Sequence, residues 1–288
     1  MTIITQARGR IASRPMTPDF VEGLLRALAA AGARTRAVVT SFGFRELLLA
    51  IGGYFAYFAV RGVTEGSHEE AVANSHDVVG LEESMGFFWE PSIQNAIVDH
   101  HWIVTLANWM YIWGHWPLIA IVASWLLMKH RDQFTLFRTA FFISGAIGVM
   151  IFVVFPVAPP RLADIGLVDT VTQHSNAYRV LQPNAFTNQY AAVPSLHFGW
   201  DLLIGIALMT NARWLAVRVF GAVVPVLMFA AIVLTANHYI FDAIAGGAVA
   251  LTGLGLALAI RRYGPAIADQ FRSPYQRNVA REPLRQAA

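Results

Sequence analysis

Six long apolar segments, spread over most of the chain, constrain its fold more than any other feature. They cover residues 44–62, 101–128, 136–156, 197–212, 214–236 and 238–260. A helix needs about 20 predominantly apolar residues to cross a bilayer, and Gly114 and Pro117 predict a kink in the second segment, or its division into two shorter helices. Only 14% of the residues are charged, whereas soluble domains have about 25%. The sequence therefore predicts an all-α, polytopic membrane helical bundle with six transmembrane helices.

The distribution of basic residues predicts the orientation of these helices. With a cytoplasmic N-terminus, only Arg61, Arg161 and Arg179 of the 21 Lys and Arg residues fall on the outer side. Cytoplasmic loops of membrane proteins carry an excess of basic residues, so we expect both termini in the cytoplasm. The net charge of +3 then reflects contact with the anionic cytoplasmic leaflet, and no nucleic-acid partner is needed to explain it.

These assignments divide the chain into one membrane domain and two polar ends. Residues 44–262 form the membrane domain, and residues 263–288 form a cytoplasmic tail that we expect to be disordered. Residues 1–43 form a cytoplasmic segment with a helix over 20–39, which either lies at the membrane interface or caps the bundle as an ordinary soluble helix. Two long outer loops cover 63–100, where we expect short helices lying on the membrane, and 157–194, which is irregular. Loops of this length are usually functional.

The last apolar segment begins with residues that can do chemistry. His238 and Asp242 are four residues apart at its start, so they share one face of the predicted helix. A carboxylate there can accept the proton of one ring nitrogen, which leaves the other nitrogen as a nucleophile or base. Asp242 also lies in an otherwise apolar helix, where a charge is costly and usually functional. The alternative is an aspartate that only pins a neighbouring helix.

The fourth apolar segment starts in a similar way. Pro194 and Ser195 are typical of a helix start, which places His197 in the first turn. The free N–H groups of that turn and the helix dipole form an anion site, so a phosphate beside His197 fits this position. The alternative is a capped helix with an incidental interfacial histidine. Asp201, four residues after His197, either pairs with it or makes a helix–helix hydrogen bond.

Further polar residues lie in the second outer loop and in the second apolar segment. Arg161 follows two prolines at the exit of the third apolar segment, and a guanidinium fork suits a phosphate. The alternative is a lone interfacial arginine that binds lipid headgroups. Asn188 and Tyr190 precede the fourth segment and are candidates for contact with a headgroup. His115 lies in the middle of the second segment, where we expect a core histidine with satisfied hydrogen bonds.

Three stretches of the chain carry a family resemblance. Pro194-Ser195-Leu196-His197 and His238-Tyr239-Ile240-Phe241-Asp242 resemble the second and third signatures of the type 2 phosphatidic acid phosphatase superfamily. They are more similar still to its inositol phosphorylceramide synthase-like (inositolphosphotransferase) branch, in which a Pro-Pro-Arg segment comes first, as Pro159-Pro160-Arg161 does here. The resemblance covers nearly all of the membrane domain.

The resemblance implies metal-independent phosphoryl transfer on a lipid phosphate or phosphodiester, without a cofactor. His238 matches the nucleophile that forms a phosphohistidine, and Asp242 matches the residue that orients it. His197 matches the general acid that protonates the leaving group and then the base that activates water or an alcohol. Arg161 matches the phosphate-binding arginine of the first signature, and we expect Ser195 of the second signature to contact the substrate as well.

The chain departs from the wider superfamily at several positions. Val154 replaces the lysine of the first signature, and Ala231 and Ile232 replace the Ser-Arg pair of the third signature. Leu196 stands where simple phosphatases favour glycine. These differences favour the transferase-like branch over a phosphatase that uses water only. They also leave fewer positively charged side chains to compensate the charge of a bound phosphate than the wider superfamily has.

The same residues are compatible with two other classes of function besides a lipid phosphotransferase. A metal hydrolase would use His197, His238 and Asp242 as zinc ligands, and a transporter or lipid-binding protein would use its ionisable residues as a relay. The ionisable residues gather at one face of the predicted bundle, which favours the enzyme. The absence of cysteine excludes thiolate metal sites and cysteine nucleophiles. The sequence leaves the oligomeric state undetermined.

The basic tail and the outer position of the motifs predict where the protein resides. We expect an integral protein of a bacterial cytoplasmic membrane, with membrane lipids as partners and the site facing outward. An internal membrane with a lumenal site would give the same sequence pattern.

Overall fold

The fold within the described part of the chain is built from α-helices. The structure is a computed structural model that describes Arg26 and residues 41–63, 66–170 and 188–271. These residues form nine α-helices, one short 3-10 helix and no β-strand. The chain divides into two compact units, Met1–Ile51 and Gly52–Ala288. The candidate site lies entirely in the second unit.

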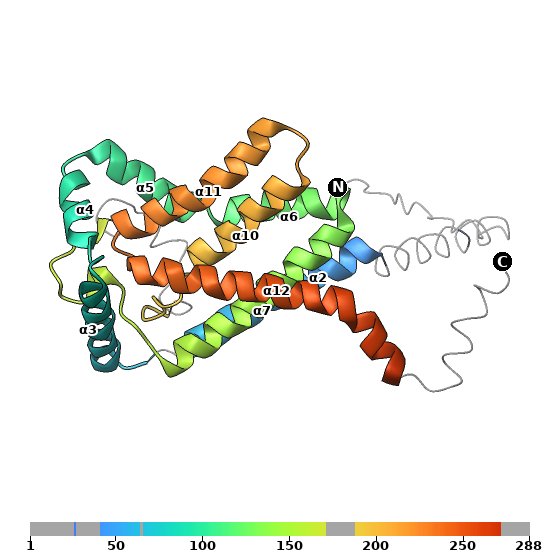
Figure 1. Cartoon of the computed structure of the whole chain (residues 1–288), viewed down its shortest axis with the longest axis horizontal. Coiled ribbons are helices and arrows are strands. Elements are labelled where there is room, and N and C mark those ends of the chain that lie inside the picture. Colours follow the sequence, from blue (N-terminus) through green and yellow to red (C-terminus); the bar gives the residue numbers. More distant parts are fainter. Residues whose placement is uncertain (1–25, 27–40, 64–65, 171–187, 272–288) are drawn as a thin grey trace, which may run out of the picture. The chain divides into compact units, whose positions relative to one another are not determined.

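The helices follow the apolar segments of the sequence closely. In chain order they are α2 (Phe42–Val63), α3 (His68–Met85), α4 (Glu90–Ile97), α5 (His101–Trp113), α6 (Trp116–Lys129), α7 (Arg131–Val154), α10 (Leu196–Asn211), α11 (Leu215–Leu234) and α12 (Ile240–Phe271), as labelled in Figure 1. The 3-10 helix η1 (Pro160–Leu162) follows α7. The second apolar segment is divided into α5 and α6, one of the two outcomes expected from Gly114 and Pro117.

Three described helices are long and apolar enough to cross a membrane. They are α7, α11 and residues Ile240–Gln270 of α12. The α5–α6 pair makes a fourth if it counts as one broken span, with a bend of 46° between its halves. The other two expected segments correspond to α2 and α10, and α10 has only 16 residues. Six spans and the cytoplasmic location of both termini therefore stay predictions.

Large apolar side chains on the outside of these helices support a membrane environment. Val154 at the end of α7 is 76% exposed, and Val226 in α11 and Ile244 in α12 are also exposed. Water would make such a surface unfavourable, whereas lipid chains cover it at no cost in hydrogen bonds, because the helical backbone satisfies its own polar groups. Several described helices are therefore suited to lie in a bilayer.

Capping residues in the sequence set the starts of two helices that matter for the site. Ser67 caps α3, where its hydroxyl accepts a hydrogen bond from the Glu70 N–H at 3.1 Å. Ser195 caps α10 in the same way, with the Phe198 N–H as donor. Helix α3 ends at Gly86, whose φ of 79° is the left-handed conformation that glycine adopts without strain. The expected helix start at Pro194-Ser195 is thus present.

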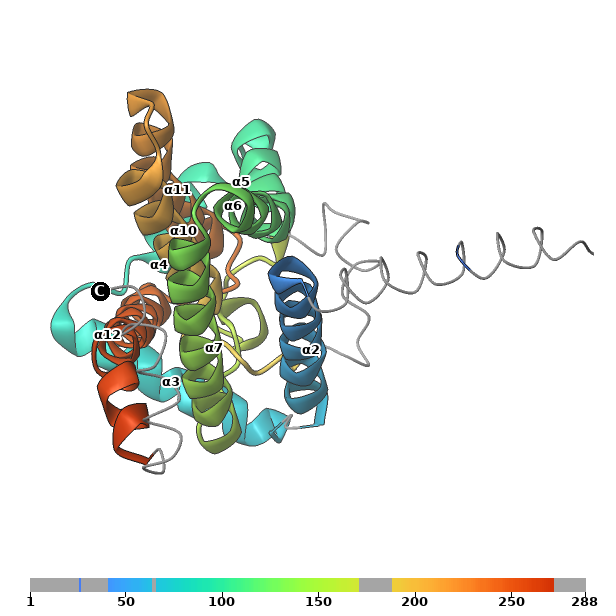
Figure 2. The same ribbon diagram turned by 90° about the vertical axis from the view of Figure 1, so that its right-hand side faces the viewer.

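Helix α10 forms the centre of the second unit and packs against α11, α12 and α7 (Figure 1). Its closest approach to α12 is at Gly199 and Gly246. A Cβ atom at Gly199 would lie 2.5 Å from the Gly246 carbonyl oxygen, and one at Gly246 would overlap the backbone of Ser195. Two glycines are therefore needed where the helices that carry His197 and Asp242 meet. Helix α7 packs against both α10 and α12 (Figure 2).

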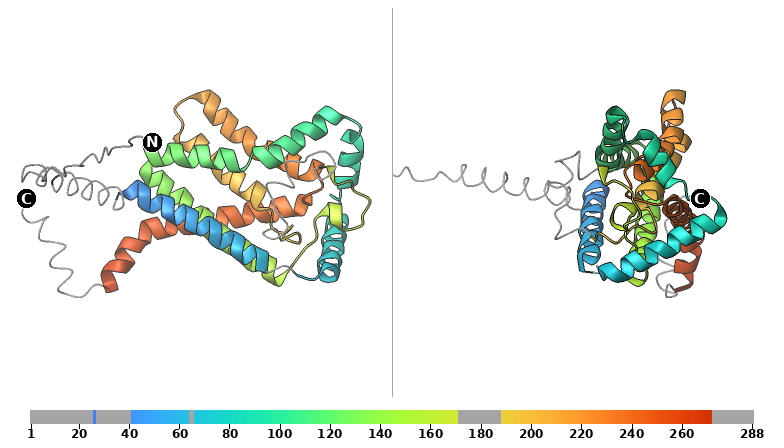
Figure 3. Two further views of the ribbon diagram at one scale, coloured as in Figure 1. Left: turned by 180° about the vertical axis from the view of Figure 1, so that it is seen from behind. Right: turned by 90° about the vertical axis from the view of Figure 1, so that its left-hand side faces the viewer.

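Helices α3, α4 and α5 hold the segment that follows α7 through side-chain amides. The Asn74 amide donates to the Pro156 carbonyl at 2.8 Å. The Gln94 side chain accepts from the Val168 N–H and donates to the Val168 carbonyl. Asn108 of α5 donates to the Thr170 carbonyl at 3.0 Å. These contacts place α3 and α4 at the end of the bundle where α12 begins, as the view from behind shows (Figure 3).

The structure tests only some of the expectations for the first outer loop and for the two ends of the chain. The first outer loop contains helices, α3 and α4, but their location on a membrane surface stays a prediction. Helix α12 continues beyond residue 262 to Phe271, so the first part of the expected disordered tail is helical. The rest of that tail lies outside the described residues. The expected helix over 20–39 also lies outside them, apart from Arg26.

Candidate functional site

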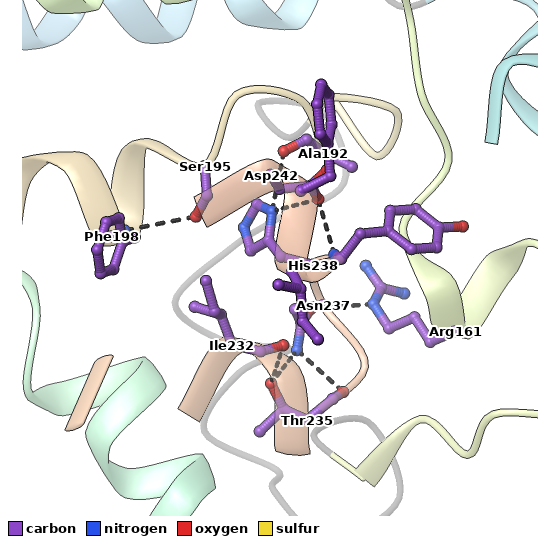
Figure 4. A network of polar contacts seen from close by, with 12 residues as sticks. Arg161, Ala192, Ser195, Phe198, Ile232, Thr235, Asn237, His238 and Asp242 are labelled. Carbon is purple, nitrogen blue, oxygen red and sulfur yellow. Dashed lines mark hydrogen bonds and ion pairs between the residues drawn. The ribbon is translucent and has the colours of Figure 1, made fainter. Parts of the chain in front are cut away.

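The connection between α11 and α12 presents His238 at the end of the bundle. Ala236 has a positive φ of 53°, and the N–H groups of Asn237 and His238 both donate to the Ile232 carbonyl, at 3.1 and 3.2 Å. The Asn237 amide donates to the Thr235 hydroxyl at 2.9 Å, as drawn in Figure 4. These bonds hold a tight turn, so the His238 side chain is fixed immediately before the first turn of α12.

Asp242 and the Ala192 carbonyl bind the same ring nitrogen of His238. Nδ1 lies 2.9 Å from the Ala192 carbonyl oxygen and 3.1 Å from Asp242 Oδ2. A carbonyl oxygen only accepts hydrogen bonds, so Nδ1 carries the proton. Nε2 of the neutral ring is then left with a free electron pair, and His238 is one of the residues that line the cavity. The pairing expected from the four-residue spacing is therefore present, and the tautomer is that of a nucleophile.

His197 faces His238 across the cavity. It lies in the first turn of α10, and the centroids of the two imidazole rings are 5.8 Å apart. Its ring is stacked on Tyr111 with a centroid distance of 4.6 Å and lies at the same distance from the His115 ring. Both expected histidines thus lie at one end of the bundle, His197 in the first turn of α10 and His238 in the turn immediately before α12.

Arg161 is attached to the same turn as His238. Its Nε donates to the Asn237 side-chain oxygen at 3.0 Å, and its backbone N–H donates to the Ala236 carbonyl (Figure 4). Its Nη1 lies 3.4 Å from the Asp169 carboxylate. Within the described part of the chain, Nη2 has no hydrogen-bond partner. The guanidinium is therefore oriented by Asn237 and keeps part of its donor edge for a ligand.

Backbone hydrogen bonds between Val157 and residues 190–192, which are far apart in the sequence, bring these residues together. The Val157 N–H donates to the Tyr190 carbonyl at 2.8 Å, and the Ala192 N–H donates to the Val157 carbonyl at 3.2 Å. The Ser195 N–H donates to the Asp242 carbonyl at 2.9 Å. The Pro-Pro-Arg segment, the start of α10 and the start of α12 are thus linked by backbone hydrogen bonds, which no periodicity in the sequence predicts.

A cavity opens among these residues. It is lined by Arg161, Asn188, His197 and His238, all of which the sequence singled out, and by aromatic side chains, among them Tyr57. Two other expected contacts are not part of the lining: the Tyr190 hydroxyl lies 3.3 Å from His68 Nδ1, and Ser195 is fully buried as the cap of α10. The Asn188 side chain accepts from the Tyr190 N–H at 2.8 Å, which shapes the rim of the cavity.

A second imidazole–carboxylate pair lies next to His197. His115 Nδ1 lies 2.8 Å from Asp201 Oδ1, and both side chains are buried. Asp201 therefore pairs with His115. The four-residue spacing also allowed a pair with His197, which does not form. His115 is buried as expected, but it also lines the cavity. The break between α5 and α6 places it there, and Gly114 with Pro117 was the sequence signal for that break.

The positions that depart from the wider superfamily contribute no charge to the cavity. Val154 is exposed at the end of α7, and Ala231 and Ile232 are buried in α11. Arg161 is the only Lys or Arg among the described residues that line the cavity. Arg161 is therefore the permanent positive charge that the described lining offers to an anionic ligand.

The described residues contain no group of three or more His, Asp or Glu side chains that could hold a metal ion. The expectation of a metal-independent site stays a prediction.

Comparison with known proteins yields one match. A family model described as the PAP2 superfamily matches residues 76–256, a range that includes Arg161, His197, His238 and Asp242. No significant match is found among curated proteins or solved structures.

Proposed function

This chain belongs to the PAP2 superfamily, and from that membership we propose that it is an integral membrane enzyme that transfers or removes a phosphate-linked headgroup of a lipid. Family membership supports a phosphatase or phosphotransferase, and several helices are apolar enough to be embedded in a membrane. The finer proposal is a metal-independent reaction through a phosphohistidine on His238. Its substrate is a lipid phosphate or phosphodiester.

One observation carries the proposal: the free Nε2 of His238, the imidazole of His197 and the guanidinium of Arg161 line one cavity. A nucleophile, a proton donor and an anion-binding group are the three components that phosphoryl transfer without a metal requires. The centroids of the two imidazole rings are 5.8 Å apart, so both histidines are close enough to contact the same phosphate group.

In the first step, the electron pair of His238 Nε2 attacks phosphorus. A P–N bond forms while the P–O bond to the leaving group breaks, and protonated His197 gives its proton to the departing oxygen. Arg161 binds the non-bridging oxygens, on which negative charge increases in the transition state. Asp242 stabilises the positive charge that the His238 ring acquires, because its carboxylate is bound to Nδ1.

In the second step, neutral His197 removes the proton from the acceptor hydroxyl. The acceptor oxygen attacks phosphorus, the P–N bond breaks, and its electron pair returns to Nε2. The protons balance, because His197 ends the cycle protonated as it began. Water as acceptor gives hydrolysis and an alcohol gives transfer, and the replacement of the glycine of simple phosphatases by Leu196 favours the alcohol. Transfer of an inositol phosphate headgroup is the version that the branch resemblance supports.

The covalent intermediate provides the first test. Purified protein in detergent is mixed with phosphatidic acid labelled on phosphorus and quenched rapidly, and acid-labile label on the protein is measured. We expect label on the wild type and none on His238→Ala. The control is His76→Ala, which changes an exposed histidine on α3 and should leave labelling unchanged.

The outcome that contradicts the proposal is specific. If His238→Ala retains the turnover of the wild type and shows an unchanged melting temperature, His238 is not the nucleophile. If turnover is lost in a chelator and restored by zinc, the reaction depends on a metal. Product analysis with phosphatidylinositol as donor and a diacylglycerol of different acyl chains as acceptor separates the two reactions, because transfer gives phosphatidylinositol with the acceptor's acyl chains and hydrolysis releases inositol phosphate.

A further inference from the structure

Two buried glutamates from α3 and α4 bind the first turn of α12. Glu82 Oε1 accepts a hydrogen bond from the Phe241 N–H at 2.7 Å, and Glu90 Oε1 accepts one from the Ile240 N–H at 2.8 Å. The Tyr239 N–H donates to Asp242 Oδ2 at 2.9 Å. Three consecutive N–H groups at this helix start are therefore bound by three carboxyl groups, so this helix terminus is closed to a phosphate ligand.

The two glutamates are too close and too buried to be ionised together. Glu82 is fully buried and Glu90 is 1% exposed, and the Glu82 side chain is within hydrogen-bonding reach of Glu90. Within the described residues, Oε2 of each glutamate is buried and has no hydrogen-bond partner. Two negative charges in contact away from water repel strongly, whereas one proton between them satisfies both atoms.

The other ionisable groups near the pair strengthen this argument. Asp242 and Tyr239 from the start of α12 face the glutamates, and neither supplies a positive charge. Burial is the main cause that raises the pKa of Glu82 to about 9, and the hydrogen bond with Glu90 adds to it. Burial also raises the pKa of Tyr239, so its hydroxyl stays protonated.

We propose that Glu82 and Glu90 share one proton and, as a carboxyl pair, position the first turn of α12 so that His238 and Asp242 keep their geometry. Both are positioning residues, because they act through the backbone of Ile240 and Phe241 and touch no reacting atom. The pair connects α3 and α4 to the site. Its effect on turnover rests on the proposed function, whereas its effect on folding stability does not.

The sign of the pH dependence follows from the shared proton. In the unfolded chain Glu82 ionises near 4.5, whereas in the folded chain it keeps its proton up to about pH 9. Between these values the folded state binds more protons than the unfolded state, so stability falls as the pH rises. The contribution is fully present below pH 4.5 and is lost as the pH rises through 9.

The test compares full-length variants in detergent between pH 5 and pH 10. Glu82→Gln keeps the oxygen that accepts from Phe241 and supplies a permanent N–H to Glu90. We therefore expect its melting temperature to fall less with rising pH than that of the wild type. The matched control is Glu83→Gln, an exposed neighbour on the same helix, which should follow the wild type at every pH. Glu82→Leu removes the acceptor and should lower the melting temperature at every pH.

Turnover gives the second readout. With phosphatidic acid as substrate, we expect wild-type activity to decline above pH 9 and the decline to be rescued by Glu82→Gln. If the melting temperatures of the wild type and Glu82→Gln depend on pH in the same way, the proposal that the two glutamates share a proton is wrong. Rescue of stability without rescue of activity would overturn the positioning role. If the wild type has no turnover at any pH, the proposed function fails, but the melting curves still decide whether the proton is shared.

Discussion

Asp242 is fully buried beneath His238, and its Oδ2 atom takes part in two of the hydrogen bonds that hold the site together. Asp242→Asn should keep the fold, because an amide oxygen can still accept from the Tyr239 N–H. It should lower kcat by up to about 10⁴-fold, because the neutral amide cannot stabilise the positive charge that the ring acquires. Single-turnover measurement of phosphohistidine formation checks this expectation. A loss smaller than tenfold would show that the Ala192 carbonyl alone orients the ring.

Arg161 carries the cationic charge of the cavity, so its chemistry should be sensitive even to a conservative change. Arg161→Lys keeps the charge but loses the planar fork and the bond to Asn237. We expect kcat/KM for phosphatidic acid to fall by about 100-fold, with little change in the melting temperature. A variant with nearly full activity would indicate that the histidines compensate the phosphate charge without Arg161.

Asp169 competes with a phosphate for the same guanidinium. It lies 3.4 Å from Arg161 Nη1, which is long for a charge-assisted hydrogen bond, so the contact is weaker than an ideal ion pair. Asp169→Asn should therefore lower KM a few-fold, because the substrate no longer displaces a carboxylate. Initial-rate kinetics on mixed micelles check the direction of the change, and an increase in KM would mean that Asp169 supports the orientation of Arg161.

At the scale of helices, the contact between α10 and α12 decides whether the two histidines meet. Gly246→Ala would place a methyl group against the Ser195 backbone. Rigid backbone cannot move aside, so we expect a loss of about 1–3 kcal/mol in the free energy of unfolding and a fall in turnover. Denaturation in detergent measures the first quantity and lipid hydrolysis the second.

The matched control for this prediction is in the same helix. Gly255 is exposed and has open space around it, so Gly255→Ala should stabilise α12 by up to about 1 kcal/mol. If both variants behave alike, the close approach of the two helices is not what makes glycine necessary at Gly246.

At the scale of the whole molecule, the orientation in the membrane is open to direct measurement. The chain has no cysteine, so single cysteines can be introduced without background. A membrane-impermeant maleimide should label His76→Cys, on α3 near the site, in intact cells. It should label Arg213→Cys, between α10 and α11, only after lysis. The reverse pattern would place the site on the cytoplasmic side.

Much of the fold and of the site could be predicted from local sequence. The apolar segments coincide with helices because apolar side chains and internally bonded backbone are what a bilayer accepts. Ser195 as a cap and the pair His238–Asp242 follow from spacings within one turn, which the helix geometry fixes. The break at Gly114 was also visible, because glycine and proline interrupt a helix wherever they occur.

The tertiary structure alone decided which side chains from distant segments meet. Asp201 and His115 are 86 residues apart in sequence and Glu82 and Phe241 are 159 apart, and no periodicity relates such positions. The packing of α3, α4, α5, α10 and α12 determines their partners, and the contact between α10 and α12 depends on the close approach of Gly199 to Gly246. Local sequence determines where helices begin and which helix face has the polar side chains, because capping bonds and contacts four residues apart lie within a single turn. Pairing across the bundle depends on the sum of many weak contacts, and so it exists only in the folded molecule.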